Sequence, residues 1–237
     1  MNSTDILSDK YFIFYIPGSM GSLLTVLMQS QILKDFHFSG FKDNTAHNYS
    51  ANRFANTHDY PQYLNFKKNN LTLEEHLIKN LKNNASLFQR CDINWCEIFL
   101  KKKNLNCVIS YIDNPLLKLK MFYTKLKDNA LKDVDNISMN FTISKTHKNY
   151  EEIIFIKTIT WWMNQEIKYM KHFPSINMLT IIEKKDYTDL KKFCTLTNTD
   201  LLDSIIDDYN SQQHYNMDIF TEFPSFIKRY LKIHYNV

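Results

Sequence analysis

The sequence predicts an α/β fold in which helices flank both faces of a parallel β-sheet. Short apolar runs, typical of strands, alternate along the chain with longer segments of helical periodicity. The first apolar run, residues 11–16, has no polar face, as expected for a central strand that is buried on both sides. Such alternation from the start of a chain favours parallel strands joined by helical crossovers.

The loop after this first strand, residues 17–22, concentrates the glycine of the chain. The 237 residues include only three glycines, and Gly18 and Gly21 both lie in this Pro-Gly-Ser-Met-Gly-Ser segment. Glycine is needed where φ is positive or where a ligand approaches the backbone closely. A loop that leads from a strand into a helix N-terminus presents N–H groups to an anion, usually phosphate. We therefore predict an anion-binding loop, and an ordinary strand-to-helix turn is the alternative.

The first half of the chain continues with a helix predicted over residues 22–34, with Ser22 as its N-cap. Residues 35–70 are polar and aromatic, and a strand is expected near residues 51–58. This segment is predicted to form the substrate side of a site, with a surface excursion as the alternative. A helix is expected over residues 71–88, because Thr72 and Glu75 have the spacing of a capping box.

The second half alternates in the same way. Residues 91–101 predict a short helix or loop around Trp95, residues 106–112 a strand, and residues 116–126 a helix that follows Pro115. Residues 127–149 are a second polar segment that we expect on the substrate side. The remaining predicted elements are a long helix (150–173, with Trp161 and Trp162 in the core), a strand (177–182), two short helices (187–195, 201–210) and a terminal helix (217–237) broken near Pro224.

The composition shows no break, so we predict one domain over residues 1–237, with residues 1–10 frayed. The net charge of +4 is spread along the chain, and no clustered basic face indicates a nucleic-acid binder. The four cysteines fit no zinc pattern, which favours free thiols in a reducing compartment. No apolar run approaches a membrane-spanning length, and the start of the chain lacks a signal-peptide pattern. We therefore expect a cytoplasmic protein without a membrane span.

The loop lacks the lysine of an ATPase-type phosphate loop, because no lysine lies between Lys10 and Lys34. Magnesium-dependent phosphoryl transfer also needs a carboxylate near a second strand end, which Asp113 or Glu183 could supply. The sequence therefore disfavours an enzyme that uses a nucleoside triphosphate.

Residues 14–24, FYIPGSMGSLL, resemble the phosphate-binding loop of sulfotransferases, in which a strand leads through a Ser/Gly-rich turn into a helix. The resemblance implies a P-loop nucleotide-hydrolase-like fold. It also implies transfer of a sulfuryl group from 3′-phosphoadenosine 5′-phosphosulfate to a hydroxyl or amine of a small-molecule or glycan acceptor. The residues that it assigns to the co-substrate are Gly18, Ser19, Met20, Gly21, Ser22 and Leu23.

Three further segments, residues 56–61, 110–123 and 177–195, are similar to later motifs of the same family. The resemblance makes His58 the general base for the acceptor, and a histidine can accept a hydroxyl proton near neutral pH. His147 is a rival in a similar tripeptide, although it follows the Asn-Pro segment. The chain departs from the family at Gly18, Asp113 and Met121, where the family has phosphate-binding side chains. Lys118, Lys120, Arg53 or Arg90 would then replace them, or the ligand would lack the 3′-phosphate.

Two other functions remain open at this point. One is a nucleotide or nucleoside kinase-like phosphotransferase with an unusual loop. The other is a non-catalytic protein that binds nucleotides or anions after losing the basic residues of both phosphate sites.

Overall fold

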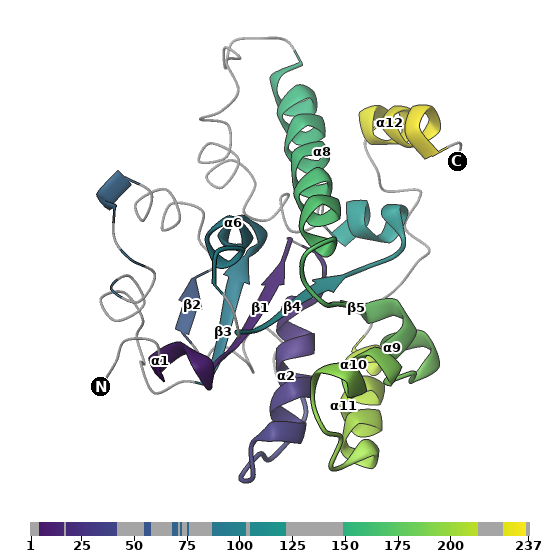
Figure 1. Cartoon of the computed structure of the whole chain (residues 1–237). Helices are drawn as coiled ribbons and strands as arrows, with labels where there is room; N and C mark the ends of the chain where they lie inside the picture. The colour runs from purple at the N-terminus through teal and green to yellow at the C-terminus, as the bar shows by residue number, and fades with distance from the viewer. Residues whose placement is uncertain are drawn as a thin grey trace.

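The computed structural model describes residues 5–16, 18–41, 55–57, 68–70, 72, 75, 87–102, 105–121, 149–212 and 225–235. Within these residues a five-stranded sheet forms in the order β2-β3-β1-β4-β5, and each neighbouring pair is parallel (Figure 1). The strands are β1 (Tyr11–Tyr15), β2 (Ala55–Thr57), β3 (Phe88–Asp92), β4 (Asn106–Tyr111) and β5 (Ser175–Asn177). The predicted parallel sheet is confirmed for this part of the chain.

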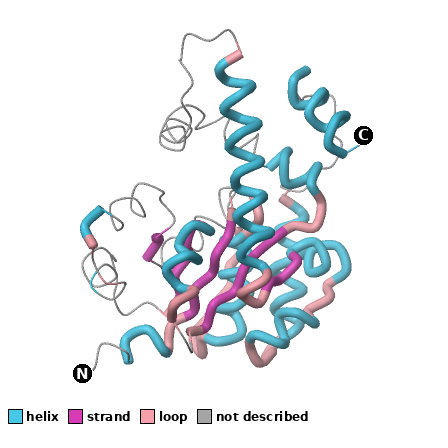
Figure 2. Tube along the Cα trace, turned by 45° about the horizontal axis from the view of Figure 1, so that its top comes forward, coloured by secondary structure: helices cyan, strands magenta, loops and turns pink. Residues whose placement is uncertain are grey.

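Helices cover both faces of this sheet, and Figure 2 shows the strands between them. One layer contains α2 (Gly21–Ile32), α9 (Met178–Lys184), α10 (Thr188–Phe193) and α11 (Thr199–Ser211). The other contains α6 (Cys96–Phe99), α8 (Tyr150–Met170) and α12 (Ser225–Tyr235). Side chains of β1 alternate between the two cores, with Phe12 and Phe14 on the α8 side and Ile13 on the α2 side. The α/β architecture is therefore as predicted.

The first strand is central, because β1 pairs with β3 on one side and β4 on the other. The helix that follows begins at Gly21, so the prediction that Ser22 is its N-cap is wrong. Met20 holds the N-cap position in a left-handed conformation with φ of 56°, and no side chain caps the helix there. Left-handed backbone at Gly18 and Met20 turns the chain early enough for Ser22 to lie inside the first turn.

The prediction for residues 87–92 is wrong. These residues were expected to end a helix over residues 71–88 and to begin a short helix or loop over residues 91–101, but residues 88–92 form the strand β3. Its sequence, Phe-Gln-Arg-Cys-Asp, has no apolar run that would mark a strand. Pairing with β1 and β2 supplies the backbone hydrogen bonds that local sequence does not indicate. After it come a 3₁₀ turn (Ile93–Trp95) and α6, which confirm the short helix predicted around Trp95. The capping box also forms, with Thr72 N donating to Glu75 at 2.8 Å and Glu75 N donating to Thr72 at 3.2 Å.

The apolar segment 177–182 was predicted as a strand, and this is wrong. The strand β5 is shorter and ends at Asn177, after which α9 begins. Asn177 Oδ1 accepts a hydrogen bond from Leu179 N at 3.1 Å, so this side chain caps the helix. Periodicity alone cannot separate a short buried strand from a buried helix turn.

Most other predicted helices are confirmed where the structure describes them, including α8, α10, α11, α12 and a helix over residues 115–121. Trp162 is buried in the α8 core and Trp161 packs against it, as predicted. Residues 5–8 form a short helix, α1 (Asp5–Ser8), instead of fraying, and Leu7 is buried. All four cysteines are free and buried. None of the helices in the described ranges is long and apolar enough to cross a lipid bilayer.

The two segments predicted on the substrate side are described only in part. Residues 35–41 follow the end of α2, and Phe41 N donates to Asp208 of α11 at 2.7 Å. This portion therefore packs on the α11 layer. Residues 42–54, 58–67 and 127–148 lie outside the described residues.

Gln31 ties the end of α2 to the turn before α11. Its Oε1 accepts from Thr197 N at 2.8 Å and from Asn198 N at 2.9 Å, and its Nε2 donates to Asn198 O at 2.9 Å. We expect Gln31→Met to lower the free energy of unfolding by about 1–3 kcal/mol, because these bonds are lost while apolar volume is kept. Urea unfolding would measure this change. An unchanged midpoint would show that water replaces the amide without cost.

Candidate functional site

The strand order reverses direction between β1 and β4. The chain leaves β1 toward β2 at one side of the sheet and leaves β4 toward β5 at the other. Ligands of open parallel sheets bind at such a switch point, beyond the carboxyl ends of the strands. The β1–α2 loop and the end of β4 meet at this place.

The β1–α2 loop contains the two glycines singled out from the sequence, and each has a different role. Gly18 has φ of 87°, the left-handed conformation that favours glycine. Gly21 has no such φ, but a Cβ there would lie 2.5 Å from two ring carbons of Tyr15. Gly18 therefore allows the turn, and Gly21 allows α2 to approach β1 closely.

The amides of this loop are only partly used by the protein. Ser19 N donates to Ile16 O at 3.0 Å, and Leu24 N donates to Met20 O at 3.0 Å. In the part of the chain that the structure describes, the amides of Gly18, Met20, Gly21 and Leu23 have no acceptor. Gly18 and Ser22 are partly exposed, whereas the other loop residues from 19 to 23 are buried, so a ligand reaches the loop over Gly18 and Ser22.

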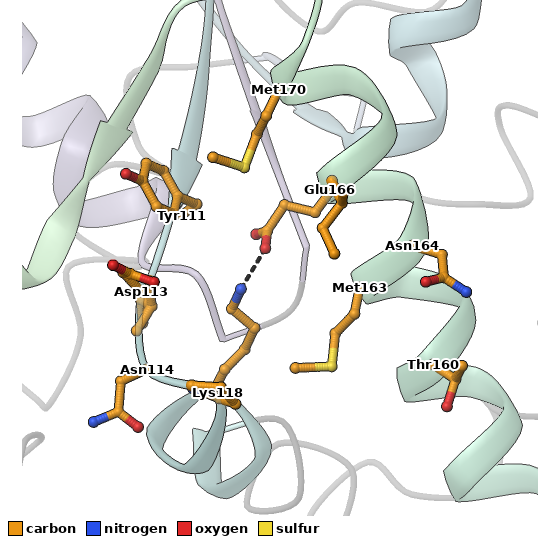
Figure 3. Close-up of a pocket in the computed structure, with 12 residues that line it drawn as sticks. Tyr111, Asp113, Asn114, Lys118, Thr160, Met163, Asn164, Glu166 and Met170 are labelled. Carbon is orange, nitrogen blue, oxygen red and sulfur yellow. Dashed lines mark hydrogen bonds and ion pairs between the residues drawn. The ribbon is translucent and has the colours of Figure 1, made fainter. Parts of the chain in front are cut away.

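A buried polar cluster lies beside the loop and consists of Ser19, Glu166 and Lys118. Ser19 Oγ donates to Glu166 Oε1 at 3.1 Å, and Lys118 Nζ forms an ion pair with Glu166 Oε2 (Figure 3). The exposed fractions are 0% for Ser19, 2% for Glu166 and 6% for Lys118. Ser110 Oγ of β4 also donates to Ser19 O. The Ser19 hydroxyl, which the sequence assigned to a bound anion, is therefore held by a carboxylate.

The electrostatics of this cluster are set by burial. Burial raises the pKa of Glu166, while the Lys118 ammonium and the Ser19 hydroxyl oppose the rise. The pKa of Tyr111, at the end of β4, is raised by burial and then by the carboxylates of Asp113, Asp189 and Glu166.

A cavity of about 420 Å³ opens next to the cluster. Its walls are the end of β4, the start of the helix over residues 115–121, and α8 (Figure 3). Glu166 and Lys118 line it, together with Asp113 and Asn114. Asn114 Oδ1 accepts from Leu116 N and Leu117 N at 3.0 Å each, which caps that helix and fixes this wall.

Sequence reasoning missed Glu166, although a signal was present. On α8 it follows Ile159 and Trp162 on the buried face, where a carboxylate is unexpected unless it has a partner. Of the substitutes named for the missing cations, Lys118 lies at this site. Met121 packs against the core on the α2 side. His58, His147 and Arg53 lie outside the described residues.

The described residues contain no group of His, Cys, Asp or Glu side chains that could hold a metal ion. No family model, curated protein or solved structure matches the chain. The function is therefore inferred from the geometry of the loop and the cavity.

Proposed function

We propose that the β1–α2 loop binds the phosphate or phosphosulfate end of a nucleotide, and that the protein is a sulfotransferase-like transferase. The main support is the position of the loop. Amides without an acceptor lie at the N-terminus of α2, directly after the central strand and at the switch point of the sheet. N–H groups and the helix dipole both favour an anion at this position.

The neighbouring cluster is compatible with an anion in the loop, because Lys118 neutralises Glu166. The loop itself carries no charged side chain, so the backbone and the α2 dipole supply the positive potential. In this proposal 3′-phosphoadenosine 5′-phosphosulfate is the co-substrate and His58 is the general base for the acceptor.

A kinase-like phosphotransferase is a second candidate, and the position of Asp113 favours it. Asp113 follows β4, the neighbour of β1, where a carboxylate could hold magnesium beside bound phosphates. Glu183, the other carboxylate considered, is exposed on α9. This candidate requires binding of ATP that strengthens with magnesium.

Thermal unfolding with added nucleotide tests the proposal. A ligand at one hundred times its dissociation constant stabilises the native state by about 2.7 kcal/mol, which raises Tm by roughly 5–10 °C in a chain of this size. We expect such a rise with 3′,5′-adenosine bisphosphate. A rise with ATP that depends on magnesium would favour the kinase-like candidate, and no rise with either nucleotide at millimolar concentration would refute anion binding.

A matched pair of variants at Ser22 ties binding to the loop. Ser22 is partly exposed in the first turn of α2, where a carboxylate is tolerated by the helix dipole. We expect Ser22→Glu to abolish the Tm rise, because its charge repels the anion, while Ser22→Gln keeps most of it. Equal responses of the two variants would mean that the anion binds elsewhere.

A further inference from the structure

The cavity at the end of β4 differs from the loop in the charge that it offers a ligand. Its lining carries the carboxylates of Asp113 and Glu166 and one ammonium, that of Lys118. Lys118 is bonded to Glu166, so the charge of Asp113 remains uncompensated within the lining. Burial is the main cause of the raised pKa of Tyr111 in the same wall, and the carboxylates of Asp113, Asp189 and Glu166 add to the rise.

The α8 wall of the cavity combines polar and apolar side chains. Met163, Ile167 and Met170 are its apolar part, next to Thr160, Asn164 and Glu166 of the same helix, and Figure 3 shows Met163 and Met170 beside the ion pair. Ile167 is 58% exposed, so it lies at the open edge of the cavity. A volume of about 420 Å³ lies in the range of small-molecule sites.

The carboxylates also have capacity for a ligand's hydrogen-bond donors. An ionised carboxylate offers about four acceptor positions. Glu166 uses one oxygen for Ser19 and the other for Lys118, so lone pairs on both oxygens remain. Asp113 is exposed and is the carboxylate that a ligand's donor meets first, while Glu166 lines the cavity but is 2% exposed, and the ligand's apolar body lies against the methionines.

We propose that this cavity binds a small molecule with an apolar body and an amine or hydroxyl donor, cationic or neutral, and excludes anions. Its place beside Ser19 makes it the subsite for the acceptor of the group held at the loop. This role rests on the proposed function, whereas the charge preference of the cavity does not.

Binding of two matched aromatic probes tests the preference. Tyramine and 4-hydroxyphenylacetate share a phenol and a two-carbon arm, and they differ in carrying a cation or an anion. Titration of the full chain with ¹³C-methyl-labelled methionine reports on Met163 and Met170, which Met163→Leu and Met170→Leu assign. We expect tyramine to shift both methyl signals and to bind at least about tenfold more tightly than the anion, because an opposite charge within a few ångströms favours it.

Two single-charge variants separate the cavity from general electrostatics. Asp113→Asn is expected to reduce the tyramine preference to less than about threefold. Asp35→Asn removes an exposed carboxylate beyond the far end of α2 and should leave the preference unchanged. Absence of a shift at Met163 and Met170, or equal binding of the two probes, would overturn the cavity assignment alone. Failure of the nucleotides to raise Tm would overturn the loop proposal and with it the acceptor role of the cavity, but not the charge preference of the cavity.

Discussion

Lys118→Met is expected to lower the free energy of unfolding by about 3–5 kcal/mol at neutral pH, the largest effect that we predict. The substitution keeps the side-chain volume but leaves Glu166 buried without its ammonium partner. Breaking a buried ion pair by removing one member strands the other charge in a medium that solvates it poorly. Urea unfolding at pH 7 would measure the loss.

The loss should depend on pH with a definite sign. Burial already raises the pKa of Glu166, and removal of Lys118 removes the largest opposing cause, so the folded pKa rises further. The pKa of a glutamate in the unfolded chain is about 4.3. Because the pKa of Glu166 is higher in the folded chain, this group contributes stability below a pH of about 4.3, and that contribution is lost as pH rises through the folded pKa. The variant should therefore differ least from the parent chain near pH 4, and the difference should grow as pH rises above that value.

A double variant distinguishes the ion pair from simple packing. Lys118→Met combined with Glu166→Gln removes both charges and keeps an acceptor for the Ser19 hydroxyl. We expect it to recover at least about half of the stability lost by Lys118→Met, since the two sites are strongly coupled. Additive losses at both sites would show that the pair contributes through packing and not through charge.

Gly21→Ala is expected to lower the free energy of unfolding by about 1–3 kcal/mol. At an ordinary helix position the same change stabilises by up to about 1 kcal/mol, so the sign is diagnostic. The reason is the 2.5 Å approach of an added Cβ to the ring of Tyr15, a buried side chain of β1 that cannot swing away freely. Urea unfolding again gives the measurement.

Ser22→Ala, one residue further along α2, is the matched control and should lower stability less than Gly21→Ala does, because Ser22 is partly exposed. In a Tyr15→Ala background the penalty of Gly21→Ala should shrink, because the two ring carbons at 2.5 Å are gone and only the Cβ of residue 15, at 3.0 Å, remains close. A stabilising Gly21→Ala in the parent chain would mean that the loop relaxes around the methyl group, and that Gly21 is not needed for close packing.

The candidate site could be predicted from the sequence only on its backbone side. Two glycines in six residues, between a buried strand and an apolar helix, indicated the loop without knowledge of the rest of the chain. The side-chain half of the site joins residues far apart in sequence. Ser19 and Glu166 are 147 positions apart, and Lys118 and Glu166 are 48 apart. No local pattern reports such a pairing.

The sequence by itself determined four elements, β1, α2, β4 and α8, because the apolar pattern of each segment predicts both its type and its burial. A continuous apolar run or a long apolar stripe on a helix is buried in any stable fold. These elements could therefore be predicted without knowing which segments pack against them. The tertiary structure alone decided that 88–92 is a strand and that Glu166 is buried, because the backbone partners of β3 and the ammonium partner of Glu166 come from distant segments. The start of α9 is different, since a local bond from Leu179 N to Asn177 Oδ1 caps this helix.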